Sequence, residues 1–184
     1  MWLDGADPAG NATLPSIGGN VSTWTDKSGN GLNGTSTGTI PVFASGGGIT
    51  FSAGAYNTSY SSSLTNECLF VVFSYTRTSG TLSLVGQTGD GARLLSLGAG
   101  ASTAQLQSSV YKVSLGALSP NTTVPINTIG LGELFTTNSS MDIFYNGTSV
   151  GTPTAVTITS GRTSIIGGAS TGGSINTSQY FGGI

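Results

Sequence analysis

Histidine is absent from this 184-residue chain, and charged residues make up only 7% of it, where about 25% is usual for a soluble domain. The chain therefore lacks the side chain that most often moves protons in enzymes near neutral pH. Its five Lys and Arg residues and its formal net charge of −2 offer no clustered positive charge for nucleic acid or anionic lipid. We expect no nucleic-acid partner.

Cysteine and long apolar runs are scarce as well. Cys68 is the one cysteine, so no intrachain disulfide can form, and its place in the apolar run ECLFVVF predicts a buried, inert thiol. No run approaches the roughly 18 apolar residues that cross a membrane as a helix. We expect no membrane insertion.

What the chain does contain is a β pattern. Short apolar or alternating segments, bounded by Gly, Asn, Ser or Pro, recur along the sequence with almost no helical periodicity. This predicts an all-β, two-sheet antiparallel sandwich of about a dozen strands. The clearest strands are expected at 48–53, 67–77, 81–87, 92–97, 105–115, 126–135, 141–145 and 163–167.

Two segments support sharper predictions. The strand at 67–77 is apolar on both faces, which is typical of a central strand. In MDIFYNGTSV, Asn146-Gly147 stands between two β runs and predicts a two-residue type I′ hairpin. No internal repeat or composition break divides the chain, so residues 1–184 are interpreted as a single domain.

The sequence resembles a known family at its beginning. The opening WLDGADP, followed by VSTWTDKSGNGLNGT, resembles the N-terminal signature of laminin G-like modules in the concanavalin A-like lectin/glucanase superfamily. The later segments ITFSAGAYN, ECLFVVFSY, MDIFYNGTSVG and TSIIGG follow the family order. The resemblance implies a jelly roll, often with glycan or protein binding, and it does not fix a ligand. A strand that usually follows the segment at 180–184 in the family is missing, from which we expect a fragment of a larger protein.

Catalytic motifs are weak. Two G-x-S-x-G matches contain Ser36 and Ser170, but a serine hydrolase needs a general base that this chain lacks. A glucanase needs two facing carboxylates, and the only glutamates are Glu67 and Glu133, without the clustered E-x-D-x-E strand of catalytic relatives. We therefore expect that the chain is not an enzyme and has no catalytic residues.

Candidate ligand contacts are aromatic. Exposed aromatic rings commonly stack on sugars, and three tyrosines lie in Gly/Ser/Asn-rich surroundings that suit this role: Tyr56, Tyr60 and Tyr180. Trp24 follows an alternating run and matches a core position of the family, so we expect it to be buried.

A calcium loop is weakly imitated by DKSGNG. Asp26, Ser28 and Asn30 carry oxygen at alternate positions, but position twelve of such a loop is Thr37, which cannot supply the bidentate carboxylate. These side chains are interpreted first as turn formers and only second as calcium ligands. No other cofactor is expected.

Asparagine context is unusual. Eight of the eleven asparagines begin an N-x-[ST] sequon, and Asn146 among them sits in a tight hairpin that suits glycosylation poorly. Either N-glycosylation or the shared preference of Asn and Thr for β turns explains this. The candidate acceptors are Asn11, Asn20, Asn33, Asn57, Asn121, Asn138 and Asn176.

Together these observations favour a non-catalytic recognition or adhesion module. It would bind a glycan or a protein partner on an extracellular or virion surface. The alternative is a structural subunit module of a capsid, fibre or surface layer, with homo-oligomer or virion assembly, because charge is depleted at interface cores. A polysaccharide-cleaving enzyme domain ranks third.

Overall fold

The protein is described here from a computed structural model covering residues 1–184. The described residues are 1–62, 66–76, 80–88, 93–99, 103–109, 123–137, 139–150, 154–155, 162–171, 174–176 and 180–181. Within these ranges the chain forms eighteen β-strands, all pairing antiparallel, and no helix that could cross a membrane. The predicted all-β, antiparallel two-sheet sandwich is confirmed.

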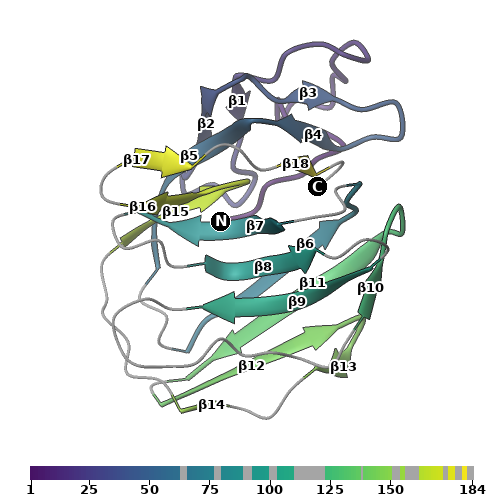
Figure 1. The fold of residues 1–184 in the computed structure, drawn as a ribbon. Coiled ribbons are helices and arrows are strands. Elements are labelled where there is room, and N and C mark those ends of the chain that lie inside the picture. The colour runs from purple at the N-terminus through teal and green to yellow at the C-terminus, as the bar shows by residue number, and fades with distance from the viewer. Residues whose placement is uncertain are drawn as a thin grey trace.

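The larger sheet forms one layer of the sandwich (Figure 1). Its order is β1-β2-β5-β15-β7-β8-β9-β10. The bounds are Thr23–Trp24 (β1), Gly34–Gly38 (β2), Gly54–Ser62 (β5), Arg162–Ile166 (β15), Gly80–Gln87 (β7), Arg93–Ala99 (β8), Thr103–Ser109 (β9) and Thr123–Pro125 (β10).

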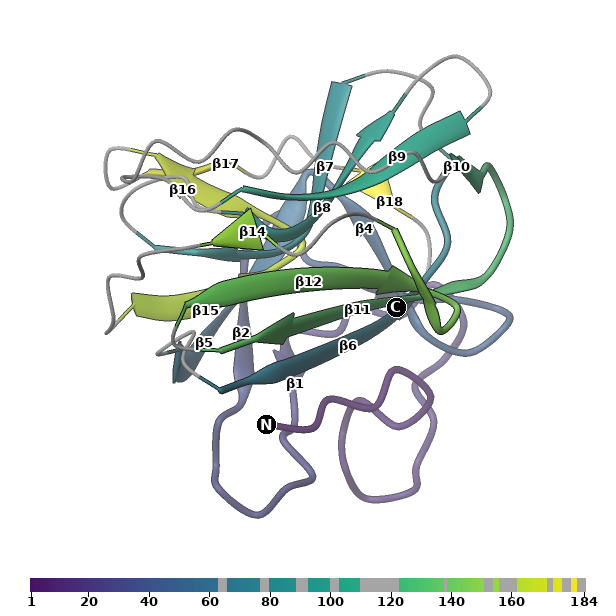
Figure 2. The ribbon, with the colours of Figure 1, turned by 90° about the horizontal axis from the view of Figure 1, so that it is seen from below.

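The second layer is a five-stranded sheet that lies across the core from β7, β8 and β9 (Figure 2). Its order is β13-β12-β11-β6, and β14 also pairs with β12. The bounds are Thr148–Ser149 (β13), Ser140–Tyr145 (β12), Gly130–Thr136 (β11), Cys68–Phe73 (β6) and Thr154–Ala155 (β14).

Two small sheets complete the fold. One pairs β18 and β3 with β4, and the other pairs β16 with β17. The bounds are Val42–Phe43 (β3), Ile49–Ser52 (β4), Tyr180–Phe181 (β18), Ala169–Thr171 (β16) and Ser174–Asn176 (β17).

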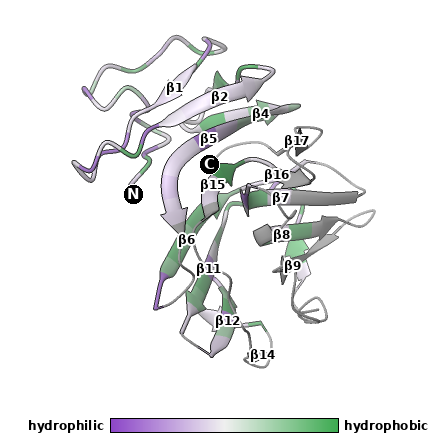
Figure 3. Ribbon diagram, turned by 90° about the vertical axis from the view of Figure 1, so that its left-hand side faces the viewer, coloured by the Kyte–Doolittle hydropathy of each residue, from purple (hydrophilic) through white to green (hydrophobic). Residues whose placement is uncertain are grey.

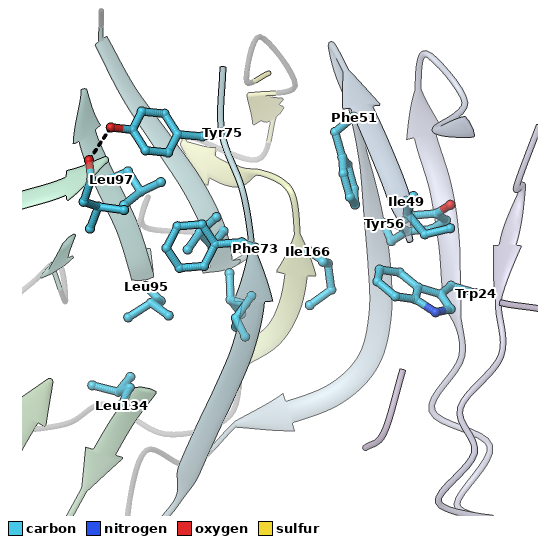
Figure 4. Packing of buried hydrophobic residues seen from close by; sticks show 14 of the residues in the cluster. Trp24, Ile49, Phe51, Tyr56, Phe73, Tyr75, Leu95, Leu97, Leu134 and Ile166 are labelled. Carbon is cyan, nitrogen blue, oxygen red and sulfur yellow. Dashed lines mark hydrogen bonds between the residues drawn. The ribbon is translucent and has the colours of Figure 1, made fainter. Parts of the chain in front are cut away.

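Aromatic side chains fill the space between the layers. Trp24 and Phe51 both pack edge-on against Tyr56, with ring centroids 5.5 and 5.7 Å away. In Figure 4 this group is connected through Ile166 to a second group around Phe73. Burial of these rings together with the aliphatic side chains around them is the main favourable contribution to folding.

Two buried tyrosines also satisfy their polar ends. The Tyr56 hydroxyl donates to the Val21 carbonyl at 2.6 Å, and the Tyr75 hydroxyl donates to the Val124 carbonyl at 2.6 Å (Figure 4, dashed line). A buried hydroxyl without such a partner would be destabilising. Burial raises the pKa of the Tyr56 hydroxyl far above its ordinary value.

Most expected strands are found. Those at 48–53, 81–87, 92–97, 141–145 and 163–167 correspond to β4, β7, β8, β12 and β15, and part of 105–115 corresponds to β9. Residues 110–115 lie outside the described residues. The type I′ hairpin is confirmed, because Asn146 and Gly147 have the positive φ values, 51° and 76°, that this turn requires.

The prediction for the strand at 67–77 is wrong in its position. β6 covers Cys68–Phe73 and stands at one end of its sheet. Its outward side chains Phe70 and Val72 are 57% and 54% exposed, and Cys68 is exposed instead of buried. An apolar pattern on both faces shows that the side chains of a strand are hydrophobic, but it does not show whether a neighbouring part of the fold buries both faces.

We predict that Gly130→Ala destabilises the protein. The Tyr145 ring lies on Gly130, and a Cβ there would overlap it. The free energy of unfolding in urea should fall by about 1–3 kcal/mol, the usual cost of overpacking. Gly46→Ala is the control because no atom lies within 4 Å of the added Cβ. Equal stability of the two variants would contradict the packing described here.

Candidate functional site

The five-stranded sheet turns an apolar face away from the core. Figure 3 shows hydrophobic stretches side by side on β6 and β11. We call this surface the outer face, and its described residues include Phe70 and Val72 of β6, Leu131, Glu133 and Phe135 of β11, and Asp142 and Phe144 of β12. Contiguous exposed apolar side chains of this kind mark interaction sites.

Glu133 lies at the centre of the outer face. The register places it directly opposite Phe70 on β6 and opposite Phe144 on β12. Its side chain is enclosed, with the residue only 8% exposed, and its Oε2 accepts a hydrogen bond from the Gly147 N–H at 3.2 Å. The hairpin turn therefore holds this carboxyl group in place.

Asp142 shares the face with Glu133. Asp142 is on β12, opposite Phe135 of β11, and it precedes Phe144 by two residues. Because Phe144 is the residue opposite Glu133, the two acids are diagonal neighbours on adjacent strands. Residues at such positions lie about 7–8 Å apart, and their Cβ atoms are somewhat closer. Asp142 is half-buried, and its Oδ1 accepts a hydrogen bond from the Ser149 hydroxyl at 3.3 Å.

Three phenylalanines share the outer face with the two acids. Phe135 packs edge-on against Phe70 and Phe144, with ring centroids 5.6 and 5.3 Å away and interplanar angles of 90° and 81°. The three rings form one cluster from three adjacent strands. Phe70 is the most exposed part of it.

A cavity of about 530 Å³ opens beside β6. Phe70 and Val72 line it from the β6 side, and Trp2 and Leu3 from the N-terminal segment. Neither Glu133 nor Asp142 lines it. Trp2 is 57% exposed, and the Lys27 ammonium lies 5.2 Å from the centroid of its ring.

The predicted aromatic ligand contacts are not gathered at this site. Tyr56 is fully buried in the core, so its role as an exposed sugar platform is ruled out. Tyr60 is half-buried on β5, where burial and the nearby Glu67 carboxylate raise the pKa of its hydroxyl. Tyr180 is on β18 and pairs with Ser52 of β4, and its side chain lies outside the described residues. Trp24 is 1% exposed, as expected.

The loop from Asp26 to Leu32 is closed by its own hydrogen bonds. Asp26 Oδ1 accepts from the N–H groups of Trp2 and Ser28, at 2.7 and 3.0 Å. Its Oδ2 accepts from the Ser28 hydroxyl at 2.7 Å and from the Leu32 N–H at 3.0 Å. Asn30 donates to the Ser28 hydroxyl at 3.0 Å. The candidate calcium ligands are thus turn formers, and no cluster of three or more metal-binding side chains occurs in the described ranges.

Electrostatics in this loop favour the ionised acid. Burial opposes the charge of Asp26, but the hydrogen bonds from Trp2, Ser28 and Leu32 outweigh it and hold the pKa of the carboxyl far below its usual range. Beside it, the Lys27 ammonium bridges Asp4 and Asp7 at 2.9 and 3.0 Å. The residues that carry the family resemblance therefore fasten the N-terminal segment to the sandwich.

The sequon asparagines are scattered over the surface. The candidate acceptors with described side chains are exposed: Asn11, Asn20, Asn33 and Asn57. Asn121 and Asn138, and the side chain of Asn176, lie outside the described residues. The Asn33 Oδ1 accepts a hydrogen bond from the Asp26 N–H at 2.8 Å. This bond does not involve the side-chain amide nitrogen, which is the atom that N-glycosylation modifies.

Comparison with known proteins identifies the fold only. No protein-family model and no curated protein matches the chain. Among solved structures, Trypanosoma rangeli sialidase matches with a TM-score of 0.56 and 15% identity, over 100% of this chain and 32% of the sialidase. The chain thus spans about a third of that protein. At this identity the likeness establishes a shared β-sandwich.

Two further matches have lower scores. The alginate lyase AlgAT5, of polysaccharide lyase family 7, has a TM-score of 0.45 and 10% identity over 85% of this chain and 74% of its own. LamAcat from Zobellia galactanivorans has a TM-score of 0.39 and 14% identity over 83% of this chain and 73% of its own.

The expectation of a non-catalytic recognition module, and of no enzyme, is corrected. The sequence argument rested on the absence of facing acids, yet β11 and β12 bring Glu133 and Asp142 to one face. The missed signal was the register of these two strands.

We predict that Asp26→Asn destabilises the N-terminal loop, because one carboxylate oxygen becomes an NH₂ group facing N–H or O–H donors. The free energy of unfolding at pH 7 should fall by about 2–4 kcal/mol. Asn30→Ala is the control, since Asn30 is exposed and makes one side-chain bond within the loop.

The same pair of proteins gives a pH test. A carboxyl with a lowered folded-state pKa stabilises fully above its unfolded pKa of about 4, and the stabilisation is lost as pH falls below that value. The difference in thermal unfolding midpoint between the wild type and Asp26→Asn should therefore become smaller as the pH is lowered from 6 to 2. A gap that stays constant would contradict the assigned role.

Proposed function

We propose that this chain is a glycan-cleaving β-sandwich domain whose acid pair is Glu133 and Asp142. The observation that supports this function is their diagonal placement on the outer face. Diagonal neighbours lie about 7–8 Å apart along the sheet, and from such positions two carboxyl groups can reach the separation of about 6.5–9.5 Å used by inverting glycoside hydrolases. That spacing leaves room for a water molecule between one acid and the sugar.

The surroundings of the two acids differ, as general acid–base chemistry requires. Glu133 is buried between Phe70 and Phe144 in the register, and its Oε2 accepts from the Gly147 N–H, a bond that does not use Oε1. Asp142 is more open and lies beside the Ser149 hydroxyl, where water has access.

These differences suggest the roles. Glu133 donates a proton to the glycosidic oxygen as the bond from that oxygen to the anomeric carbon breaks. Asp142 takes a proton from the water whose oxygen forms the new bond to the anomeric carbon. Both carboxyl groups then return to their starting state by proton exchange with solvent. The products are two shorter glycans, and the configuration at the anomeric carbon is inverted.

We predict that Glu133→Gln and Asp142→Asn each reduce the cleavage rate by about 10²–10⁴-fold, since each removes one acid–base step. The measurement is the release of reducing ends from laminarin, xylan, soluble cellulose and alginate. NMR of the first products should show inversion.

Glu67→Gln is the matched control for these variants. Glu67 is the other glutamate of the chain, and it precedes β6 near Tyr60, away from the outer face. Its replacement should leave the rate within about twofold of the wild type, because the residue takes no part in the proposed chemistry. The proposal fails when the wild-type protein cleaves none of the four polymers, or when Glu133→Gln remains fully active.

We also propose that the domain is laminin G-like and works outside the cell. The first part rests on WTDKSGNG, whose side chains close the Asp26 loop. The second part rests on the exposed sequons and the weakly charged surface.

Secretion leads to a prediction about modification. Expressed in a eukaryotic secretory host, the protein should lose mass on peptide-N-glycosidase treatment, and Asn11→Gln should remove one glycan because Asn11 is an exposed loop residue. Asn146→Gln is the control. Asn146 accepts from the Leu131 N–H at 2.8 Å within the tight turn, so its replacement should leave the number of glycans unchanged. Intact-mass measurement decides, and a secreted protein without glycans would contradict the prediction.

A further inference from the structure

The outer face and the adjoining cavity have a composition that the cleavage chemistry does not use. Phe70, Phe135 and Phe144 flank the acid pair, and Trp2 lies across the cavity that Phe70 also lines. Burying apolar side chains stabilises a fold, but Phe70 and Trp2 are each 57% exposed and gain little of that stabilisation. Their exposure needs another explanation.

The charges of the outer face narrow the choice of ligand. Its described residues include the carboxylates Glu133 and Asp142, and no Lys or Arg is among them. Elsewhere in the described chain, Lys27 is paired with Asp4 and Asp7, and Arg93 and Arg162 belong to strands of the other sheet. Among the described residues, an anionic glycan would meet like charge here without a compensating cation.

An uncharged glycan fits these groups. The C–H faces of sugar rings can lie on aromatic rings, and sugar hydroxyls can donate to carboxylate oxygens. We propose that the outer face binds a neutral polysaccharide, with sugar rings on Phe144 and Phe70 and with Trp2 extending the path beyond the edge of β6. This inference rests on the proposed function, and it names the class of substrate.

The register sets the path of the glycan. Phe70, Glu133 and Phe144 form one row across three strands. Phe70 and Phe144 are thus two strand spacings apart, about 10 Å, with Glu133 between them. A glycan lying along this row would reach from Phe70 to Phe144 and pass over Glu133.

The test is binding of neutral and anionic oligosaccharides, measured by titration calorimetry with the whole 184-residue chain. The probes are laminarihexaose, cellohexaose and xylohexaose, against a hexamer of mannuronate. At least one neutral hexamer should bind, and the uronate should bind at least about tenfold more weakly, the factor that corresponds to about 1.4 kcal/mol.

Variants locate the site. Phe70→Ala should weaken binding of the neutral hexamer about tenfold, Trp2→Ala about threefold, and Phe70→Trp should restore it because the ring is kept. Ile17→Ala is the control, since Ile17 is 71% exposed in a loop apart from the outer face. Circular dichroism checks that each variant is folded.

The outcomes separate this inference from the proposed function. Neutral glycan bound equally by the wild type and Glu133→Gln, with no cleavage by either, supports the inference and defeats the proposed function. Cleavage or tighter binding of the uronate, or binding that Phe70→Ala leaves unchanged, overturns the inference. Sedimentation showing a dimer that Phe70→Ala dissociates overturns it as well, because the face would then be covered by a second copy of the chain.

Discussion

The pairing of β11 with β6 and β12 is the constraint on which the site depends. Antiparallel pairing alternates side chains between the two faces, so Leu134 enters the core while Glu133 points outward. A slip of one residue would exchange these positions and bury a carboxylate among apolar side chains. The register is fixed locally, since Asn146 bonds to both backbone groups of Leu131 and Gly130 leaves room for the Tyr145 ring. The same strand pairing therefore stabilises the sheet and positions Glu133 on the outer face.

Much of the fold can be predicted from the sequence because local patterns determine it. Alternation and turn residues located most strands, and the Asn146-Gly147 turn follows from the positive φ values that this pair tolerates. The position of β6 in its sheet could not be predicted in this way. Strand order depends on contacts between distant segments, and CLFVVF is equally apolar whether its outer face is covered or open.

The acid pair could not be predicted from the sequence for a related reason. Glu133 and Asp142 are nine positions apart, on strands whose register is set by the turn between residues 136 and 140 and by the hairpin after β12. Composition suggested that facing acids were absent, but seven acidic residues are enough when a sheet brings two of them together. The family resemblance did not help, because its most specific residues close the Asp26 loop and have no part in the outer face.

The absence of histidine limits this chemistry less than the sequence alone suggests. Two carboxyl groups suffice for glycoside hydrolysis when one is sheltered and the other is open to water, because each then takes a different part in proton transfer. The outer face provides that difference without any unusual residue. In the proposed function, the phenylalanines that would hold a sugar also flank Glu133 in the register, so substrate binding and the shielding of the proton donor would depend on a single aromatic cluster.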